Sequence, residues 1–323
     1  MKQIKLDASA RIMYQEAQKR GIKCTTFGDN NTILMQKNGK HWYTRGSRTS
    51  FQSAIGCVIA NLKELTKKIL THFDLPTAKY VVVKNSEEIQ NIDKLQFPLV
   101  MKPIAGAHGR DVIVGIKDIE EAKKYYQEKP QKVLFEEMLE GTEYRIVCVD
   151  FKFVAAAFRK AAYVTGDGKK SITQLIDEKN QHPWRKEGHE GNLTKIKIDN
   201  LLKGYLKEQN LSLDSIPSKN KEVILRKTAN LSTGGEAWNV TNQVSPENKK
   251  LFEKIAKACD LNVIGIDMMC QNLNTDITQQ NKAGIIEVNK SPGLRMHHYP
   301  MKGKPINIAA KILDLVEKQL ALN

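Results

Sequence analysis

VIGIDMM (residues 263–269) and GIIEVN (residues 284–289) are two apolar, strand-like segments that each carry an acidic residue. Successive side chains of a strand point to opposite faces, so Glu287 and Asn289 share one face. Asp267 lies in mid-strand, where a buried carboxylate needs a cation or a hydrogen-bond donor. If the two strands are neighbours, the three side chains converge on a site suited to Mg²⁺ that bridges phosphates. The alternative is that they are ordinary polar residues of an edge strand.

The sequence around these segments predicts a mixture of helices and strands. Helices are expected where apolar residues recur every three to four positions, and Ser245-Pro246 marks the start of one. Asp150 and Asn38-Gly39 mark turns between strands. The order of the expected strands and helices predicts an antiparallel sheet with helices on one side. The expected helices span 5–20, 61–73 and 306–321, with others from Ser86 and Ser245, and the expected strands span 24–27, 32–36, 80–84, 99–102, 111–116, 133–136, 144–149 and 152–159.

Composition predicts a compact protein of about two domains. Of the 323 residues, 41% are hydrophobic and 27% charged, close to the averages of globular proteins. Lys and Arg total 51 against 36 Asp and Glu, and the net charge of +15 favours an anionic partner such as a nucleotide, an acidic metabolite or nucleic acid. The five cysteines are scattered without the spacing of a zinc site, so buried free thiols are expected.

The chain is expected to be cytoplasmic and to have no membrane partner. Its longest stretch without a charged residue, 49–62, is shorter than the roughly 20 apolar residues of a membrane span. The N-terminal segment carries charges throughout and lacks the apolar core of a secretory signal.

Three further motifs suit the binding of a nucleotide or a carboxylate. AGAHGR (105–110) follows Lys102, and its glycines allow backbone N–H groups to cradle phosphate oxygens, although a plain hairpin turn is the alternative. EEMLEGTEYR (136–145) has two carboxylates seven residues apart that could meet a base and a ribose, unless it is a solvated loop. TANLSTGG (228–235) has the small and hydroxyl-bearing residues that anion recognition requires, but a linker would look similar.

The order of these motifs resembles that of the ATP-grasp ligases, and within them the ATP-grasp region of cyanophycin synthetase and of the fused bacterial glutathione synthetases. The likeness covers about residues 45–318. Its motifs are ANLKELTKKIL (60–70), FPLVMKPIAGAHGRDV (97–112), EEMLEGTEYR (136–145), GDGKKSITQLI (166–176), NQHPWRKEGHEGNLTKI (180–196), LRKTANLSTGG (225–235), GIDMM (265–269) and EVNKSPGLRMHHYPMKGKP (287–305).

The resemblance implies an α+β fold in which two α+β subdomains clamp ATP. It implies a small α/β N-terminal unit at residues 1–60 and an ATP-grasp domain at residues 61–323. The cofactors would be ATP and Mg²⁺, and the partners a small-molecule or short peptide substrate with a carboxylate and an amine co-substrate. A homo-oligomer is also expected from the family.

The resemblance also implies roles for individual residues. The nucleotide lysines would be Lys63 and Lys102, and the glycine-rich flap would include Gly106, His108 and Gly109. Adenine would be held by Glu136, Glu137, Met138 and Leu139, and the ribose would be bound by Glu143. Asp267, Glu287 and Asn289 would hold Mg²⁺, in agreement with the argument from strand faces. Arg145, Arg159, Arg226 and Arg295 would meet the γ-phosphate, the acyl phosphate or a substrate carboxylate, and Asn230, Ser232, Thr233, Gly234 and Gly235 would bind substrate.

The implied reaction activates a carboxylate as an acyl phosphate, which an amine then attacks. Such chemistry needs neutralisation of charge more than a protein nucleophile, and no convincing nucleophile triad is found in the sequence. The loop at 181–192 is a candidate lid that keeps water from the acyl phosphate. Leu62 stands where the family often has Asp, and Lys186 replaces a glycine of the lid region.

Two substrate pairs stay open at this stage. Joining γ-glutamylcysteine to glycine, as glutathione synthetases do, is the leading hypothesis, and addition of an acidic amino acid to a peptide, as in cyanophycin synthetase, is the alternative. Two other classes are a nucleotide-binding pseudo-ligase, which the intact set of predicted ligands disfavours, and a nucleic-acid-binding protein. The dispersed lysines and the lack of a nucleic-acid-binding motif disfavour the latter, so no nucleic-acid partner is expected.

Overall fold

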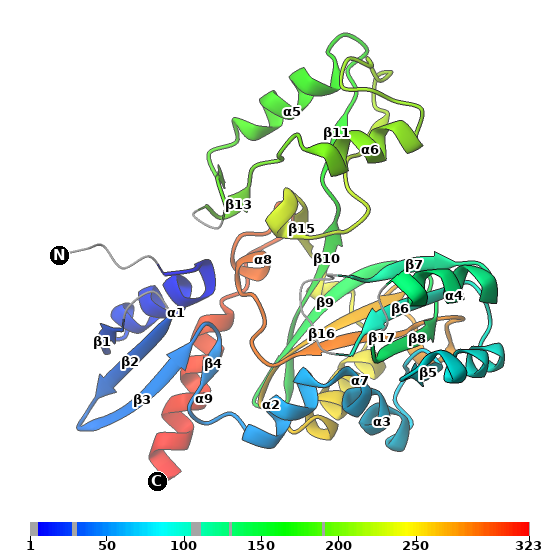
Figure 1. The fold of residues 1–323 in the computed structure, drawn as a ribbon. Coiled ribbons are helices and arrows are strands. Elements are labelled where there is room, and N and C mark those ends of the chain that lie inside the picture. Colours follow the sequence, from blue (N-terminus) through cyan, green and yellow to red (C-terminus); the bar gives the residue numbers. More distant parts are fainter. Residues whose placement is uncertain (1–5, 28–30, 105–110, 129–130, 189–190, 323) are drawn as a thin grey trace. The chain divides into compact units, whose positions relative to one another are not determined.

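The computed structural model describes residues 6–27, 31–104, 111–128, 131–188 and 191–322. The chain divides into two compact units, whose elements are labelled in Figure 1. Unit 1 comprises residues 1–51, 155–241 and 293–323, and unit 2 comprises residues 52–154 and 242–292. The predicted mixture of helices and antiparallel strands is confirmed. The division into residues 1–60 and 61–323 stays a prediction.

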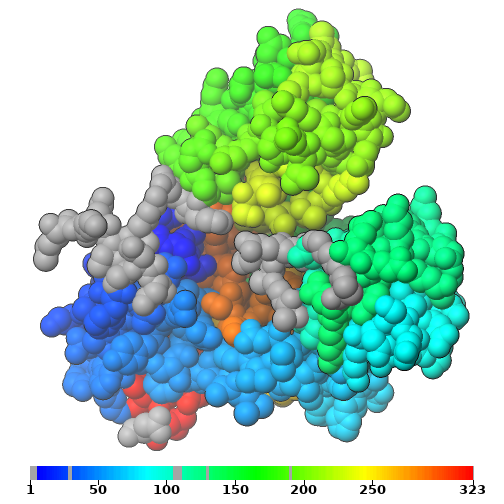
Figure 2. All heavy atoms as spheres, in the orientation of Figure 1, coloured from blue at the N-terminus to red at the C-terminus, as the bar shows by residue number. Residues whose placement is uncertain are grey.

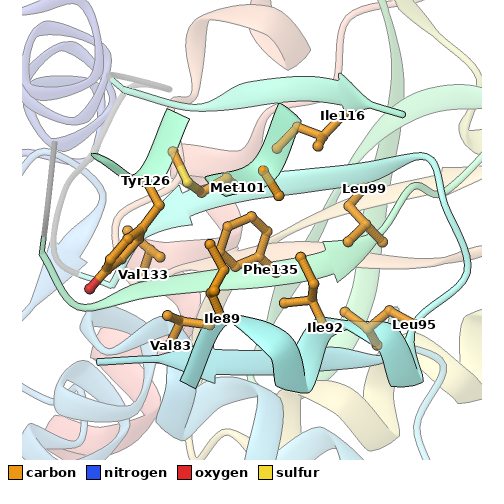
Figure 3. Close-up of a cluster of buried hydrophobic side chains, with 11 residues drawn as sticks. Val83, Ile89, Ile92, Leu95, Leu99, Met101, Ile116, Tyr126, Val133 and Phe135 are labelled. Atoms are coloured by element: carbon orange, nitrogen blue, oxygen red, sulfur yellow. The ribbon is translucent and has the colours of Figure 1, made fainter. Parts of the chain in front are cut away.

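One layer of unit 2 is a four-stranded antiparallel sheet with the strand order β5-β8-β6-β7. Apolar side chains from one face of this sheet pack with those of η1 and α4, and Phe135, Met101 and Ile92 lie in this core (Figure 3). Because side chains alternate along a strand, Lys102 and Glu136, which follow Met101 and Phe135, point to the opposite face. The elements are β5 (Tyr80–Val83), η1 (Ser86–Lys94), β6 (Leu99–Pro103), β7 (Ile113–Ile116), α4 (Ile119–Glu128) and β8 (Val133–Glu137).

A second layer of unit 2 has β16 (Val263–Cys270) paired on its two sides with β9 (Thr142–Val149) and β17 (Gly284–Asn289). The helix α7 (Pro246–Ala258) begins as predicted, with Ser245 as its N-cap. The helix expected over 61–73 is α3 (Lys63–His72), and a further helix, α2 (Ala54–Asn61), was not predicted. At the end of α2, whose residues belong to the light-blue surface in Figure 2, Asn61 Oδ1 accepts a hydrogen bond of 2.6 Å from Lys290 Nζ.

Unit 1 contains a four-stranded antiparallel sheet near the N-terminus, with the order β1-β2-β3-β4. The helix α1 packs against β1, β2 and the C-terminal helix α9 (Figure 1). Arg20 fixes this arrangement, because its Nη1 donates to Asp314 Oδ1 on α9 at 2.9 Å. The predicted turn at Asn38-Gly39 joins β2 to β3, and both residues have positive φ. The elements are α1 (Ala8–Lys19), β1 (Lys23–Thr26), β2 (Thr32–Lys37), β3 (Lys40–Arg45), β4 (Arg48–Thr49) and α9 (Ile308–Leu322).

The remainder of unit 1 is built around short strands and the helices α5, α6 and α8. Residues Asp150 and Phe151, both at positive φ, turn the chain from β9 into β10 (Lys152–Lys160), which pairs with β15 (Glu236–Asn239). A capping box at Ser171 starts α5. The other elements are β11 (Tyr163–Thr165), α5 (Ile172–Asn180), β12 (Arg185–Lys186), β13 (Leu193–Thr194), α6 (Asn200–Glu208), β14 (Glu222–Ile224), η2 (Leu231–Thr233) and α8 (Arg295–His298). The short helix η3 (Thr241–Gln243) spans the point in the sequence where unit 1 gives way to unit 2, and η4 (Ile277–Gln279) belongs to unit 2.

Within the described ranges, none of the helices combines the length and the apolar character that crossing a bilayer requires.

The close approach of α2 to the end of α7 generates a test of the packing in unit 2. A Cβ added at Gly56 would overlap the carbonyl of Asp260 and lie 2.9 Å from Cys259 O. We expect Gly56→Ala to lower the free energy of unfolding by about 2 kcal/mol, as overpacking does. Gly204→Ala in α6 is the control, because its Cβ meets nothing within 4 Å and should raise stability by about 0.5 kcal/mol. Urea unfolding of both variants measures the difference, and equal stabilities would contradict this packing.

Candidate active site

The three predicted metal ligands come together in unit 2. Asp267 on β16 is the direct cross-strand partner of Glu287 on β17, and Asn289 is the partner of Gly265. Asn289 Nδ2 lies 3.4 Å from Asp267 Oδ2 and 3.4 Å from Glu287 Oε1. Asp267 is buried, and the other two are partly buried. The structure thus brings two carboxylates and one amide to a single point on the two strands.

Arg145, one of the predicted catalytic arginines, is the partner of Asp267 on the other side of β16. Its Nη2 donates to Asp267 Oδ2 at 2.9 Å, and its Nε donates to Oδ1. Burial lowers the pKa of Arg145, but the carboxylate of Asp267 outweighs this effect and raises the pKa. Burial and the neighbouring charge of Asp267 raise the pKa of Glu287. Asp267 therefore has a fixed cation, whereas the charged form of Glu287 is disfavoured by burial and by the charge of Asp267.

A second cluster of charges lies on the face of the four-stranded sheet opposite the apolar core. Lys102 on β6 pairs with Glu136 Oε1 on β8, and Lys67 on α3 reaches Glu136 Oε2 at 2.8 Å. All three side chains are buried. Burial by itself raises the pKa of Glu136, but the two lysines outweigh it and hold the pKa below its ordinary value. The side chain of Glu136, predicted to hold adenine, is thus engaged by two lysines.

Lys67 is a residue that the sequence analysis missed. Besides Glu136, its Nζ donates to Thr77 Oγ1 at 2.7 Å, and Thr77 Oγ1 lies 3.4 Å from Ile285 O on β17. Lys67 therefore connects the lysine–carboxylate cluster to the strand that carries Glu287. The available signal was its spacing of four from Lys63, which puts both lysines on one face of α3. Burial lowers the pKa of Lys63, and the charge of Glu287 opposes this effect, so Lys63 lies within electrostatic reach of that carboxylate.

The segment predicted to hold adenine comprises the last two residues of β8 and the two residues that follow it. Backbone N–H groups of Glu137 and Met138 donate to Lys79 O at 3.0 Å and Pro98 O at 3.1 Å, which fixes the path of the chain. Gly284 on β17 lies close to the side chain of Leu139. Glu143 lies on β9 opposite Met269. Gly106, His108 and Gly109 lie outside the described residues.

In unit 1 the structure brings Arg159 and the predicted substrate-binding segment together. Arg159 Nη2 donates to Asn230 Oδ1 at 2.9 Å, and its Nε donates to Ala229 O at 3.2 Å. The segment turns at Leu231–Thr233, where Ser232 lies, and Gly234 has a φ of 96°, which favours glycine. The N–H of Gly235 closes the turn on Asn230 O at 3.1 Å.

The other two predicted arginines of unit 1 have different surroundings. Arg226 binds Asp199 through two hydrogen bonds of 2.8 Å, and Asp199 in turn caps α6. The guanidinium of Arg226 lowers the pKa of Asp199, as in a structural ion pair. Buried Arg295, at the start of α8, donates to Gly191 O at 3.3 Å and lies 3.4 Å from Thr194 Oγ1. Within unit 1, Arg159, Arg226 and Arg295 therefore each have different hydrogen-bond partners.

Two family models match this chain, and both describe ATP-grasp domains. The ATP-grasp (A) domain of phosphoribosylglycinamide synthetase matches residues 61–162, and the RimK-like ATP-grasp domain matches residues 218–316. The chain has the ATP-grasp fold, and its predicted resemblance to the ATP-grasp ligases is confirmed.

The chain is similar to two particular kinds of enzyme. It is 37% identical over 318 residues to cyanophycin synthetase of Synechocystis sp., covering 96% of this chain and 36% of that protein. It is 30% identical over 320 residues to the glutathione biosynthesis bifunctional protein of Clostridium perfringens, covering 96% of this chain and 41% of that protein. The crystal structure of a bifunctional glutathione synthetase from Pasteurella multocida matches with a TM-score of 0.78 and 27% identity, over 97% of this chain and 44% of that one.

This chain therefore spans less than half the length of these relatives. Because this coverage is partial, ligase activity stays a proposal for this chain.

The buried lysine–carboxylate cluster generates a test by a double-mutant cycle. Lys67→Met and Glu136→Gln each leave buried charges without a full partner, so each should lower the free energy of unfolding by about 3 kcal/mol. The double variant should lose at least about 1 kcal/mol less than the sum, because the two side chains interact directly.

The matched control is the surface pair of Lys123 and Glu120 on α4, whose side chains lie 2.7 Å apart and are 41% and 76% exposed. Its coupling should stay below about 0.5 kcal/mol. Additive losses at Lys67 and Glu136 would show that the buried pair is not formed.

Proposed function

We propose that this chain is an ATP- and Mg²⁺-dependent ligase that joins a carboxylate to an amine through an acyl phosphate. The observation that carries the proposal is the convergence of Asp267, Glu287 and Asn289 in the same unit as the buried lysine Lys102. Oxygen ligands beside lysines are what the transfer of a phosphoryl group requires, because it depends on neutralising charge.

The residues of unit 2 suit MgATP. Asp267, Glu287 and Asn289 would hold Mg²⁺, and the raised pKa of Glu287 marks negative charge that a cation would relieve. Bound there, Mg²⁺ would neutralise the charge of the phosphates. Lys63 and Lys102 would bind phosphate oxygens, with Glu136 and Lys67 holding Lys102 in position. Because the carboxylate of Glu136 is engaged, the backbone of Glu137–Leu139 would bind adenine, with Glu143 on the ribose.

The residues of unit 1 suit the carboxylate substrate. Arg159 and the turn from Asn230 to Gly235 would position the substrate, and Arg295 would meet a carboxylate or the acyl phosphate. In the first step a carboxylate oxygen attacks the γ-phosphorus and ADP leaves. In the second step the amine attacks the carbonyl carbon and loses a proton, and inorganic phosphate leaves from the tetrahedral intermediate.

Two substrate pairs each have an observation in their favour. The match over 97% of the chain to a bifunctional glutathione synthetase favours γ-glutamylcysteine and glycine, the leading hypothesis. The higher identity to cyanophycin synthetase favours addition of an acidic amino acid to a peptide. A cytoplasmic location and a homo-oligomeric state stay predictions.

Release of phosphate from MgATP tests this proposal. The purified chain is given γ-glutamylcysteine with glycine, or acidic amino acids with short acidic peptides, and the products are identified by mass spectrometry. We expect ADP, phosphate and one new amide product in equal amounts with one of the two sets. ATP binding without turnover of any pair would contradict the proposal and favour a nucleotide-binding pseudo-ligase.

A further inference from the structure

Unit 1 contains a pocket that has no assigned role in the proposed reaction. Its volume is about 340 Å³, at the lower end of the roughly 300–1,000 Å³ of small-molecule sites. Three separate parts of unit 1 form it: the helix α1, residues 183–186 with 191–192, and Tyr299 at the end of α8. The N-terminal helix thus lines one cavity together with described residues of the candidate lid segment.

The lining of this pocket is basic. Arg11 from α1 and Lys186 from β12 are its charged side chains among the described residues, and the other described lining residues are neutral. Two cationic side chains from distant parts of the sequence therefore face one cavity. Such a lining attracts an anion.

Arg295 adds a third cation behind the lining. Its guanidinium donates to the carbonyl of Gly191, which itself lines the pocket, and lies near the hydroxyl of Thr194. Both partners are neutral, although Arg295 is buried. Burial lowers the pKa of Arg295, and the charge of Arg11 lowers it further. Two guanidinium groups that repel each other would both be stabilised by an anion bound between them.

The wall of the pocket is aromatic. The rings of Trp184 and Tyr299 lie edge to face with centroids 6.0 Å apart, and both residues line the cavity. An aromatic wall suits the apolar or amide part of a ligand, whereas the cations suit its charged groups. The combination favours a ligand with carboxylates on a peptide over a small inorganic anion.

We propose that this pocket binds a free carboxylate of an acidic peptide substrate through Arg11 and Lys186, with Arg295 reinforcing the positive charge. The inference rests on the proposed ligase function and deepens it, because it assigns the peptide substrate class to a site in which α1 takes part. Guanidinium and ammonium groups bind carboxylates with charge-assisted hydrogen bonds, and binding of this kind raises affinity without requiring ATP.

Isothermal titration calorimetry without ATP tests this site. The probes are γ-glutamylcysteine, aspartyl-aspartate and free aspartate, and asparaginyl-asparagine is the neutral counterpart. We expect the wild-type chain to bind an acidic dipeptide at least about tenfold more tightly than the neutral one, because a charge-assisted hydrogen bond accounts for a factor of this size. Arg11→Gln and Lys186→Gln should each remove most of this difference, and Arg11→Lys should retain part of it.

Lys19→Gln is the matched control, because Lys19 lies on the same helix with its side chain 74% exposed and the variant loses the same charge. Equal affinity of Arg11→Gln and Lys19→Gln for the acidic dipeptides would overturn the proposal, and so would equal binding of acidic and neutral dipeptides. Tighter binding of free aspartate than of either dipeptide would overturn the peptide assignment.

Turnover separates this inference from the proposed function. In the active enzyme, Arg11→Gln should raise KM for the peptide substrate about tenfold while KM for ATP stays unchanged, because Arg11 belongs to unit 1. Binding without turnover would contradict the ligase and leave the pocket supported. Turnover with an unchanged KM in Arg11→Gln would support the ligase and overturn the pocket.

Discussion

Two carboxylates that face each other on neighbouring strands set the main constraint on unit 2. Asp267 and Glu287 are cross-strand partners in largely buried surroundings, where like charges at this distance are unfavourable. Arg145 on the third strand compensates Asp267 through two hydrogen bonds, whereas the hydrogen bond described for Glu287 comes from the neutral amide of Asn289. Arg145 therefore balances one of the two carboxylates within the sheet, and the charge of the other, Glu287, suits a bound cation.

The buried cluster of Lys67, Glu136 and Lys102 also constrains unit 2, because its ion pairs join different elements. Breaking such a buried group is costly, so it fixes the directions of side chains more than it adds stability. Glu136 lies between two lysines from different elements, and Thr77 extends the contacts of Lys67 to β17. The lysine expected to bind phosphate and the strand expected to bind metal are thus connected through the ion pairs of Glu136 and the hydrogen bonds of Thr77. In unit 1, in contrast, the basic pocket around Arg11 has cations whose described partners are few or neutral.

The sequence predicted what depends on local pattern and missed what depends on distant partners. The alternation in GIIEVN placed Glu287 and Asn289 on one face, and Ser245-Pro246 marked the start of α7, as the structure confirms. The strand expected from residue 111 begins at Ile113, because Asp111 has a φ of 55°. The pairing of Arg226 with Asp199 and the role of Lys67 could not be read from the sequence, since each depends on a contact between elements that no periodicity specifies. Gly106, His108 and Gly109 lie outside the described residues, so the roles assigned to them stay predictions.

The most direct measurement of the central claim is the Mg²⁺ dependence of nucleotide binding. A non-hydrolysable ATP analogue is titrated into the wild-type chain, into Glu287→Gln and into Glu120→Gln, with Mg²⁺ or with a chelator. The account predicts that Mg²⁺ tightens binding at least about tenfold in the wild type and in Glu120→Gln, and only slightly in Glu287→Gln, because a carboxylate ligand has been replaced by a neutral amide. An undiminished effect of Mg²⁺ in Glu287→Gln would contradict it.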